Sequence, residues 1–511
     1  MLLRSAFAPY RLAPGALPEE GALDARLVGA GPLVVPTDLP LRPALVSQAL
    51  ASVEVGGAAS EAEACRSADG VLAGNPEAPR ACLVGERHRQ RVGEETAAAL
   101  AAGYGGVVFQ EPDSPLVQGV LGAGFCPDCQ REFQRRLVRK YGDPFQPLDY
   151  LATARAALAG ASGALSLEAL PFGRDFWRFR HETLERAVRA HVRAAHDAGR
   201  EAGRAFTLCA WFAALGPSQL AAARHLDAAV FPIALSGQPL AGRFEFLRGA
   251  LWRRAVAVEP PADAPPAAWL RLASLGAPFG IGLAGVQPRG EAGAVLAGIR
   301  ALMSQVAALG GAPGVATPLT ECSVLYSAEA DLWSGGRHRR AVEAAIETLA
   351  FRQLQVTLAL RPSEVPPGTP LVLADATPLS RLERREVEKR RAAGGTILAF
   401  AGPGDEGSFG RAVDAVFPAG RRAVALSASV PVIAVVRAYD EAVDVHLATS
   451  WPERAARVRL RLPVVATRGA RWARFRTSDG AEARVRFSSA GDRVVADLPT
   501  FTGYAVLSPE T

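Results

Sequence analysis

The sequence predicts an α/β protein: a (β/α)8 TIM barrel, then a flavodoxin-like α/β domain, then a small C-terminal antiparallel β-sandwich. Three patterns lead to this prediction. From about Gly31 to Gly310, short apolar runs alternate with amphipathic helical stretches, as in repeated parallel βα units. A second alternation begins near Cys322, and from Val424 onward apolar and polar residues alternate with period two. We therefore expect three domains, at 1–315, 316–422 and 423–511.

Length and composition place the chain among large globular proteins. Its 511 residues are too many for one hydrophobic core, and 49% hydrophobic with 21% charged residues is typical of folded proteins. The formal net charge of +6 comes mostly from arginine, but acids are interleaved with it, which indicates solvated helix faces. The N-terminal residues make a poor signal peptide, and no uninterrupted apolar stretch reaches the ~18 residues of a membrane span. We therefore expect a cytoplasmic protein with no nucleic-acid or membrane partner.

The strands of the predicted barrel are short apolar runs, several of which end in a polar residue. The runs are "PLVVPTDLP", "GGVVFQE", "AFTLCAWF", "HLDAAVFPIAL", "RRAVAVE" and "APFGIGLAGV". More than five such strands over this length favour a closed barrel over an open sheet. Between two of them, "DFWRFRHETLERAVRAHVRAAHDAGREAG" places apolar residues at helical spacing and predicts a long helix.

Shorter segments predict the second and third domains. We expect strands at "CSVLYSAEADLW", "TPLVLADAT" and "TILAF", and helices at "RRAVEAAIETLAFRQL" and "LSRLERREVEKRRAAGG", the second stopped by Gly394 and Gly395. No Gly-x-Gly-x-x-Gly turn follows the first of these strands, which argues against a dinucleotide site. Period-two alternation in "VIAVVRAY", "AVDVHLAT", "RVRLRLPV" and "RVVADL" predicts the strands of the sandwich.

Two glutamates end clear strand segments. Glu111 ends "GGVVFQE" and Glu259 ends "RRAVAVE", and a proline follows each. Active sites of such barrels lie at the carboxyl ends of the strands. Taken separately, each glutamate fits a structural role better than a catalytic one, but the pair is a stronger signal, because two carboxylates across a barrel mouth are the groups that hydrolyse glycosides.

Two cysteines follow the first of these strands. Cys126 and Cys129 form a Cys-x-x-Cys pair, for which a metal clip, a redox centre and two structural thiols are the alternatives. A redox centre fits least, because the pair follows a long loop rather than opening the first helix of a βαβ unit. The other four cysteines are isolated in the sequence, and we expect them as reduced buried thiols: Cys65, Cys82, Cys209 and Cys322.

The cysteine segment carries a family resemblance. "GFCPDCQREFQRRLVRKYGD" resembles the segment Cys-x-Cys-Pro-x-Cys-x-x-x-Phe-x-x-x-Leu-x-x-x-Tyr-Gly of family 42 β-galactosidases and their uncharacterised relatives. "DFWRFRHETL" looks like the helix that follows in those enzymes. "SVLYSAEADLW" and "VEKRRAAGGTILAF" resemble parts of their trimerisation domain, and "VDVHLAT…LPTFTGYAVLSP" resembles their C-terminal β domain. The order matches over nearly the whole chain.

The resemblance implies a retaining glycoside hydrolase of the β-galactosidase type, acting on a small β-linked glycoside. It makes Glu111 the acid/base on the fourth barrel strand and Glu259 the nucleophile on the seventh, with carboxyl groups about 5–5.5 Å apart. Those enzymes have Asn before the acid/base, whereas this chain has Gln110. We expect Gln110, Trp211 and Gln287, which end predicted strands or follow them closely, as substrate contacts. The resemblance also implies a homo-oligomer, a trimer, formed through 316–422.

The same resemblance bears on metal binding. Its zinc site uses the cysteine triplet and one earlier cysteine, but the first member of the triplet here is Gly124. Cys126 and Cys129 are candidate ligands, yet two thiolates cannot complete a tetrahedral zinc shell. Cys65, Cys82 or His88 could join them, but nothing in the sequence requires it. We therefore expect a structural turn without metal and no cofactor.

Two other functions are alternatives to a retaining glycoside hydrolase. One is a catalytically inactive carbohydrate-binding or assembly protein on the same scaffold. It is distinguished by whether Glu111 and Glu259 converge on an open cleft. The other is a metal-dependent barrel hydrolase, which needs His-x-His or clustered carboxylates at strand ends. The seven histidines of the chain show no such arrangement.

Overall fold

The computed structural model describes most of the chain between Leu50 and Glu510. The described residues are 50–116, 121–142, 149–159, 170–203, 206–235, 239–251, 254–285, 290–310, 317–376, 378–438 and 443–510. They fall into two compact units, one ending at Pro232 and the other beginning at Ile233, and each is described by itself. The strand predicted in "PLVVPTDLP" lies outside the described residues. Among the described helices, none has the length and apolar character to cross a lipid bilayer.

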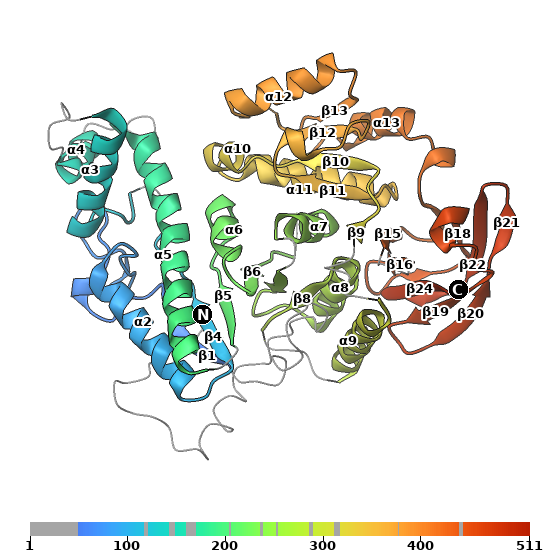
Figure 1. The fold of residues 1–511 in the computed structure, drawn as a ribbon, viewed down its shortest axis with the longest axis horizontal. Coiled ribbons are helices and arrows are strands. Elements are labelled where there is room, and N and C mark those ends of the chain that lie inside the picture. Colours follow the sequence, from blue (N-terminus) through green and yellow to red (C-terminus); the bar gives the residue numbers. More distant parts are fainter. Residues whose placement is uncertain are drawn as a thin grey trace. The chain divides into compact units, whose positions relative to one another are not determined.

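Parallel strands form the sheet of the first unit (Figure 1). In the order β1–β4–β5–β6 they are Leu50–Glu54, Gly106–Gln110, Thr207–Trp211 and Ala228–Pro232. The carboxyl ends are in register, because Gln110 pairs with Glu54 on one side and with Trp211 on the other. The sequence predicted β4, β5 and β6, but it did not single out β1.

Helices cover this sheet and the loops around it. They are α2 (Glu86–Ala101), α3 (Pro127–Tyr141), α4 (Tyr150–Ala159), α5 (Gly173–Glu201) and α6 (Pro217–Ala223). α2 packs on β1 and β4 and lies side by side with α5 (Figure 1). Phe176, Phe179 and Leu184 on α5 are buried, as their helical spacing predicted. Three short elements lie between β1 and α2: η3 (Glu61–Glu63), β2 (Gly74–Asn75) and β3 (Ala78–Pro79).

The second unit begins with further βα repeats. They comprise α7 (Leu240–Ala250), β7 (Ala255–Glu259), α8 (Pro266–Gly276), η6 (Ala277–Phe279), β8 (Ile281–Leu283) and α9 (Glu291–Gly310). β7 and β8 are parallel neighbours, with Val258 paired to Leu283. The repeats follow the order that the sequence predicted, whereas closure into an eight-stranded barrel stays a prediction.

A second parallel sheet follows in the same unit. In the order β11–β10–β12–β13 its strands are Val356–Ala359, Cys322–Leu325, Leu371–Ala374 and Ile397–Phe400. This order is that of a flavodoxin-like sheet. Its helices are α10 (Ala328–Trp333), α11 (Arg337–Phe351), η7 (Pro362–Glu364), α12 (Arg381–Ala392) and α13 (Glu406–Val416).

Two details of this sheet differ from the prediction. The strand expected throughout "CSVLYSAEADLW" ends at Leu325, because the Ser327 hydroxyl accepts a hydrogen bond from the Ala330 amide at 3.1 Å and caps α10. The other difference is β11, a four-residue strand that the sequence did not predict. By contrast, α12 ends as predicted, two residues before Gly394, which has a φ of 80°.

Antiparallel strands form the C-terminal part of the second unit, as the period-two pattern predicted. One sheet has the order β14–β18–β22–β21, and the other has the order β20–β19–β24–β16–β15–β9. Their bounds are β9 Thr317–Pro318, β14 Ala425–Ser427, β15 Ile433–Ala438, β16 Val443–Ala448, β18 Val458–Pro463, β19 Trp472–Thr477, β20 Glu482–Arg486, β21 Ser488–Ala490, β22 Arg493–Leu498 and β24 Tyr504–Glu510. The smaller elements are η8 (Ala419–Arg421), β17 (Arg454–Ala455), α14 (Val464–Thr467) and β23 (Phe501–Thr502). Apolar side chains of both sheets, among them Leu460 and Phe475, share one core.

Buried ion pairs join the parts of the second unit. Arg243 on α7 contacts the two carboxylate oxygens of Glu343 on α11 at 3.2 and 3.1 Å. Gly242 permits this approach, because a Cβ there would lie 1.9 Å from the carbonyl oxygen of Glu343. Arg437 on β15 lies 3.4 Å from Glu245 on α7.

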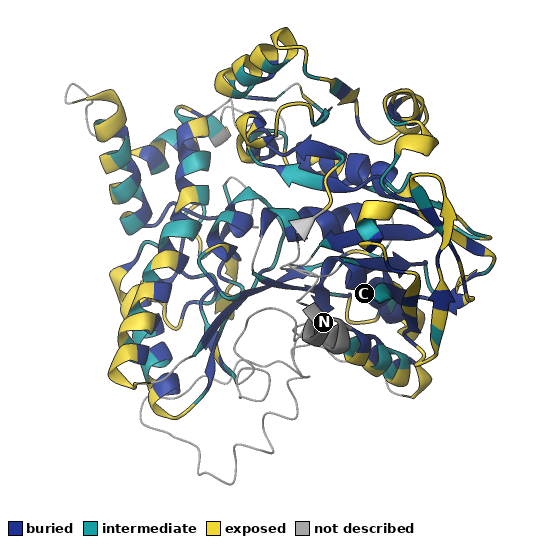
Figure 2. Ribbon diagram, turned by 45° about the vertical axis from the view of Figure 1, so that its right-hand side comes forward, coloured by how far each residue is buried: buried dark blue, intermediate teal, exposed yellow. Residues whose placement is uncertain are grey.

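Figure 2 shows the strands buried along most of their length and exposed residues gathered mainly on helices and turns. The predicted boundaries at 315 and 422 stay predictions.

Candidate active site

The carboxyl edge of the first unit's sheet gathers polar and aromatic residues. Glu54, Gln110 and Trp211 end β1, β4 and β5, and they are partners in register. Residues in register on parallel strands project on the same face of a sheet. All three are partly exposed. The structure therefore brings together two predicted substrate contacts, Gln110 and Trp211, and adds a carboxylate that the sequence did not predict, Glu54.

Glu111 follows β4 in an unusual backbone conformation. Its φ is 40°, a left-handed value that is uncommon for a residue other than glycine. Its amide donates a hydrogen bond of 2.8 Å to the carbonyl of Trp211, which fixes the turn against β5. The Nη1 of Arg80 lies 3.4 Å from its Oε2, and the Glu111 side chain is 30% exposed. The carboxylate is thus held by a cation while it stays open to solvent.

Glu54 is the additional carboxylate at this edge. Its Oε1 accepts a hydrogen bond of 2.7 Å from the Gly57 amide. Burial raises the pKa of Glu54, the Gly57 hydrogen bond opposes the rise, and the charge of Glu111 adds to it. The sequence does contain a signal for this residue. In the alternating run "LASVEVGG", Glu54 stands near the end of the run, just before a pair of glycines.

Asp113 holds the loop that follows β5. The residue is fully buried, and its oxygens accept hydrogen bonds from the amides of Ala213 and Ala214 at 2.8 and 3.0 Å and from the Gln219 side chain at 2.9 Å. Burial raises its pKa to about 6, although these three donors favour the charged form. Asp113 therefore ties the Glu111 loop to the segment that follows Trp211.

Glu259, the second predicted catalytic residue, belongs to the second unit. It is the last residue of β7 and is partly exposed, and its carbonyl accepts a hydrogen bond of 2.9 Å from the Ile233 amide. A Cβ at Gly285, just after β8, would lie 4.0 Å from its Cγ. Because Glu111 and Glu259 lie in different units, the distance between their carboxyl groups stays a prediction. Gln287 lies outside the described residues.

Four cysteines of the first unit form one cluster. The Sγ atoms of Cys65, Cys126 and Cys129 lie within 4.8 Å of one another, and Cys82 Sγ lies 3.1 Å from Cys126 Sγ and 3.6 Å from Cys129 Sγ. All four are buried and free of disulfide bonds. Cys65 and Cys82, which are isolated in the sequence, thus meet Cys126 and Cys129 in space, because the loop before α2 folds back onto the start of α3. The prediction of reduced, buried thiols is confirmed for Cys65, Cys82, Cys209 and Cys322.

The cluster offers thiols to a metal ion. Zinc bound by four thiolates at about 2.3 Å requires sulfur atoms about 3.8 Å apart, and the three sulfurs that all lie within 4.8 Å of one another are those of Cys65, Cys126 and Cys129. His88, which the sequence suggested as a further ligand, has another neighbour. Its Nδ1 lies 3.2 Å from Nη2 of Arg91. Four protein ligands fill a zinc shell, so an ion here would be structural, with no open position for substrate.

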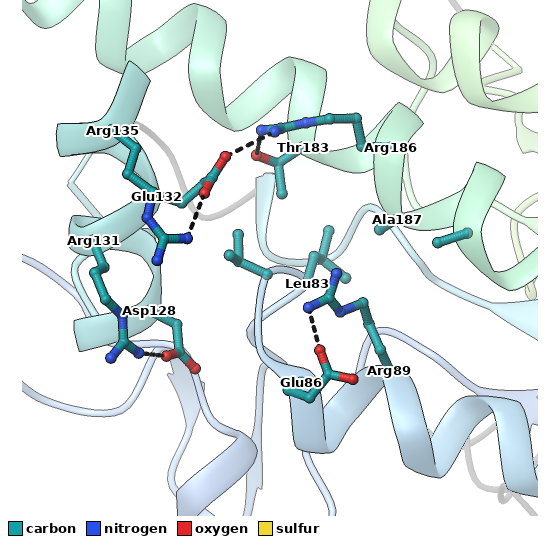
Figure 3. A pocket seen from close by; sticks show the side chains of 12 residues that line it. Leu83, Glu86, Arg89, Asp128, Arg131, Glu132, Arg135, Thr183, Arg186 and Ala187 are labelled. Carbon is teal, nitrogen blue, oxygen red and sulfur yellow. Dashed lines mark hydrogen bonds and ion pairs between the residues drawn. The ribbon is translucent and has the colours of Figure 1, made fainter. Parts of the chain in front are cut away.

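A pocket of about 430 Å³ lies among α2, α3 and α5 (Figure 3). Four arginines and three acids line it, and the acids contact the arginines. Glu132, for example, lies 3.3 Å from Arg186 and 3.5 Å from Arg135. None of its lining residues belongs to a strand of the sheet. Its charges are largely satisfied internally, so we place the candidate active site at the strand ends instead.

Comparison with known proteins gives fold-level likeness only. No family model matches the chain, and no curated protein matches it. A GH42 beta-galactosidase from G. stearothermophilus aligns over 99% of this chain and 92% of its own, with a TM-score of 0.62 and 12% identity. Alpha-L-fucosidase isoenzyme 2 from Paenibacillus thiaminolyticus aligns over 96% and 89%, with a TM-score of 0.60 and 10% identity.

A third solved structure is a rhamnosidase from Novosphingobium sp. PP1Y, with a TM-score of 0.53 and 12% identity. The alignment covers 85% of this chain but only 48% of the rhamnosidase, so this chain spans about half the length of that protein. At these identities the likenesses show a fold shared with glycoside hydrolases: a mixed α/β fold with a parallel sheet.

Proposed function

We propose that the chain is a retaining glycoside hydrolase of the β-galactosidase type that acts on a small β-linked glycoside. Glu111 is the acid/base, and Glu259 is the nucleophile. The observation that carries the proposal is the setting of Glu111. This partly exposed glutamate has a φ of 40° at the carboxyl edge of a parallel sheet, beside Arg80 and Glu54. Strained, charged residues of this kind are concentrated at active sites.

The reaction has two steps. In the first, the Glu259 carboxylate attacks the anomeric carbon while Glu111 gives its proton to the departing oxygen, so that the glycosidic bond breaks and a glycosyl ester forms. In the second, Glu111 takes a proton from water, the water oxygen attacks the anomeric carbon, and the ester bond to Glu259 breaks. Two displacements return the original anomeric configuration.

Side chains at the strand ends supply the substrate contacts. The amide of Gln110, which reaches one methylene further than the Asn of the β-galactosidases, hydrogen-bonds a sugar hydroxyl. The ring of Trp211 offers an apolar face on which a sugar ring stacks, and Gln287 is a further polar contact in the proposal. The guanidinium of Arg80 orients Glu111 and is positioned to meet a hydroxyl beside it.

A screen of aryl β-glycosides tests this proposal. We expect turnover by the wild type and a loss of about 10²–10⁴-fold in kcat/KM for Glu111→Gln, with a loss at least as large for Glu259→Gln. Glu388→Gln, on the exposed surface of α12, is the matched control and keeps full activity. The Glu111 variant loses least on glycosides with acidic leaving groups, because these need no proton. Saccharide binding without turnover of any glycoside would favour the inactive carbohydrate-binding protein.

The assembly of the chain belongs to the same proposal. Residues 316–422, which resemble a trimerisation domain, join three copies in a cytoplasmic enzyme. Light scattering at micromolar concentration tests this. A trimer supports it, and a monomer contradicts it.

A further inference from the structure

The pocket among α2, α3 and α5 is an unfilled space within the first unit. Its volume of about 430 Å³ falls within the range of about 300–1,000 Å³ that small-molecule sites occupy, whereas voids larger than a water molecule are few in well-packed interiors. Its lining includes buried apolar side chains, such as those of Leu83 and Ala187, besides the arginines and acids. The space therefore offers both apolar surface and charged groups to a ligand.

Glu132 is shared among more arginines than one carboxylate can neutralise. Its Oε1 lies 3.4 Å from Nη2 of Arg139 and 3.3 Å from Nη1 of Arg186, and its Oε2 lies 3.5 Å from Nη1 of Arg135. All three distances exceed the roughly 2.7–2.9 Å of strong charge-assisted hydrogen bonds. One negative charge against three positive charges leaves an excess of two positive charges beside the pocket, which attracts a further anion.

The other two acids of the lining do not offset this excess. Glu86 pairs with Arg89, and Asp128 pairs with Arg131, each within its own helix. Each of these carboxylates is matched by one guanidinium, so neither pair has negative charge left for the arginines around Glu132. We therefore leave Arg89 and Arg131 out of the proposed contacts.

Arg186 is held in place from two sides. Its Nη2 donates a hydrogen bond of 3.1 Å to the hydroxyl of Thr183, and its guanidinium lies 5.8 Å from the ring centre of Phe179. Its Nε is buried and has no hydrogen-bond partner among the described residues. A guanidinium fixed in this way loses little side-chain entropy when it binds an anion. In Figure 3, Glu132 lies between Arg186 and Arg135, so its carboxylate marks the place at which an anionic group would meet both arginines.

We propose that this pocket binds a small organic molecule that carries a phosphate monoester, with Arg135 and Arg186 as the groups that bind the phosphate. A phosphate monoester has a charge of about −1.5 to −2 near neutral pH, which matches the excess of positive charge, whereas a sulfate monoester carries a single negative charge. Guanidinium groups suit phosphate oxygens, because they present parallel N–H donors in a planar fork. Leu83 and Ala187 are available to the organic part of the molecule. The proposal does not depend on the hydrolase function.

Calorimetric titration of the full chain at low ionic strength, with glucose 6-phosphate as the probe, tests the proposal. We expect glucose 6-phosphate to bind, glucose 6-sulfate to bind about 10-fold more weakly, and glucose not to bind at the same concentrations. Inorganic phosphate should bind more weakly than glucose 6-phosphate, because it leaves the apolar side chains uncovered. Equal affinity for the two esters would contradict the charge match, and equal affinity for inorganic phosphate would contradict an organic ligand. No binding at millimolar concentration would overturn the whole proposal.

Substitutions around Glu132 test the contacts. Arg135→Met and Arg186→Met each remove one guanidinium, and we expect each to raise the Kd for glucose 6-phosphate by about 10- to 100-fold. Glu132→Gln removes the carboxylate that competes with the phosphate, so we expect it to lower the Kd. Arg200→Met, at an exposed arginine in the last turn of α5, is the matched control and binds as the wild type does. Wild-type affinity in both arginine variants, or weaker binding by Glu132→Gln, would overturn the assignment.

Hydrogen exchange locates the site without any substitution. When glucose 6-phosphate is added to the wild type, we expect slower exchange in peptides over 83–89, 128–135 and 183–190, and unchanged exchange in peptides over β10 and β12. Protection in other peptides alone would place the ligand elsewhere and contradict the proposal. The side chain of Arg135 is 69% exposed, so Arg135→Met keeps the packing and still decides the matter if Arg186→Met fails to fold.

Discussion

The guanidinium of Arg80 lies 3.4 Å from a carboxylate oxygen of Glu111, although the two residues are thirty-one positions apart in the chain. Arg80 reaches this point because its backbone is held on both sides: its amide donates to the carbonyl of Ala73 at 2.8 Å, and its carbonyl accepts from Cys65 at 2.7 Å. The loop between β1 and α2 thus places a positively charged side chain beside the end of β4. A charge placed in this way orients the carboxylate that is the proposed acid/base.

Removing this cation tests its contribution to the proposed reaction. Arg80→Met keeps the length of the side chain but leaves Glu111 without its charged partner. We expect kcat/KM for an aryl β-glycoside to fall by about 10- to 100-fold, and Arg80→Lys to fall less, because it keeps the charge. Arg131→Met, at an exposed arginine on α3, serves as the control. Unchanged kinetics in Arg80→Met would show that the contact is structural.

The buried carboxyl of Asp113 gives a pH dependence of stability. Its pKa is about 6 in the folded chain and 3.8 when unfolded, so the folded state binds the proton more tightly. The unfolding free energy therefore falls as pH rises between about 4 and 6, by a contribution of the order of 3 kcal/mol. We expect urea unfolding of the wild type to show this slope and Asp113→Asn, which cannot titrate, to lack it. Equal slopes for the two proteins would contradict the assignment.

Removal of a structural metal ion from the cysteine cluster would affect the first unit more than the second. All four clustered thiols lie in the first unit, and binding of a structural ion stabilises the segments that hold its ligands. After incubation with a chelator, we expect faster hydrogen exchange in peptides that cover 61–85 and 121–142. Peptides over β10 and β12 in the second unit serve as the internal reference and keep their protection. Equal changes in both sets would argue against a local metal effect.

The ion pair between Arg243 and Glu343 contributes to the stability of the second unit. Its two side chains are 6% and 0% exposed. Glu343→Gln leaves Arg243 buried without its carboxylate, and we expect the unfolding free energy to fall by about 3–5 kcal/mol. The matched control is Arg459→Ala, which breaks a two-contact pair with Asp497 at 2.7 and 3.3 Å on the exposed surface. It has little measurable effect, since solvent screens that pair. A similar small effect of Glu343→Gln would refute the prediction.

The sequence predicts the strands well where apolar runs are bounded by turn residues. β4, β5, β6, β7 and β8 all lie within the predicted segments. Local patterns miss β11, because four residues are too few to show a period. They also miss the strand that ends at Glu54, where the first hundred residues offer few regular elements.

The contacts of the candidate site could be predicted only where they depend on local patterns. That Glu111, Gln110 and Trp211 lie near one another could be predicted, because strand ends are visible in the sequence and parallel strands bring their ends together. The contact between Cys65 and Cys129 could not, because it depends on the loop between β1 and α2 folding back onto the start of α3. The placement of Arg80 beside Glu111 arises from the same loop. Spacing in the sequence shows which groups are available, and long-range packing decides which of them meet.

The stereochemistry of the product tests the pairing of Glu111 with Glu259. A nucleophilic carboxylate must reach the anomeric carbon directly, which requires carboxyl groups about 5–5.5 Å apart, whereas a base that activates water stands about 6.5–9.5 Å away. We expect proton NMR, recorded within the first minutes of hydrolysis, to show the β-anomer of the released sugar before mutarotation. Glu259→Ala should regain turnover with azide and give the α-glycosyl azide, because azide attacks from the face that the carboxylate has left. Glu111→Ala with azide should give the β-glycosyl azide, since Glu259 still forms the ester. Release of the α-anomer by the wild type would assign Glu259 as a base and place the two carboxyl groups at the longer separation.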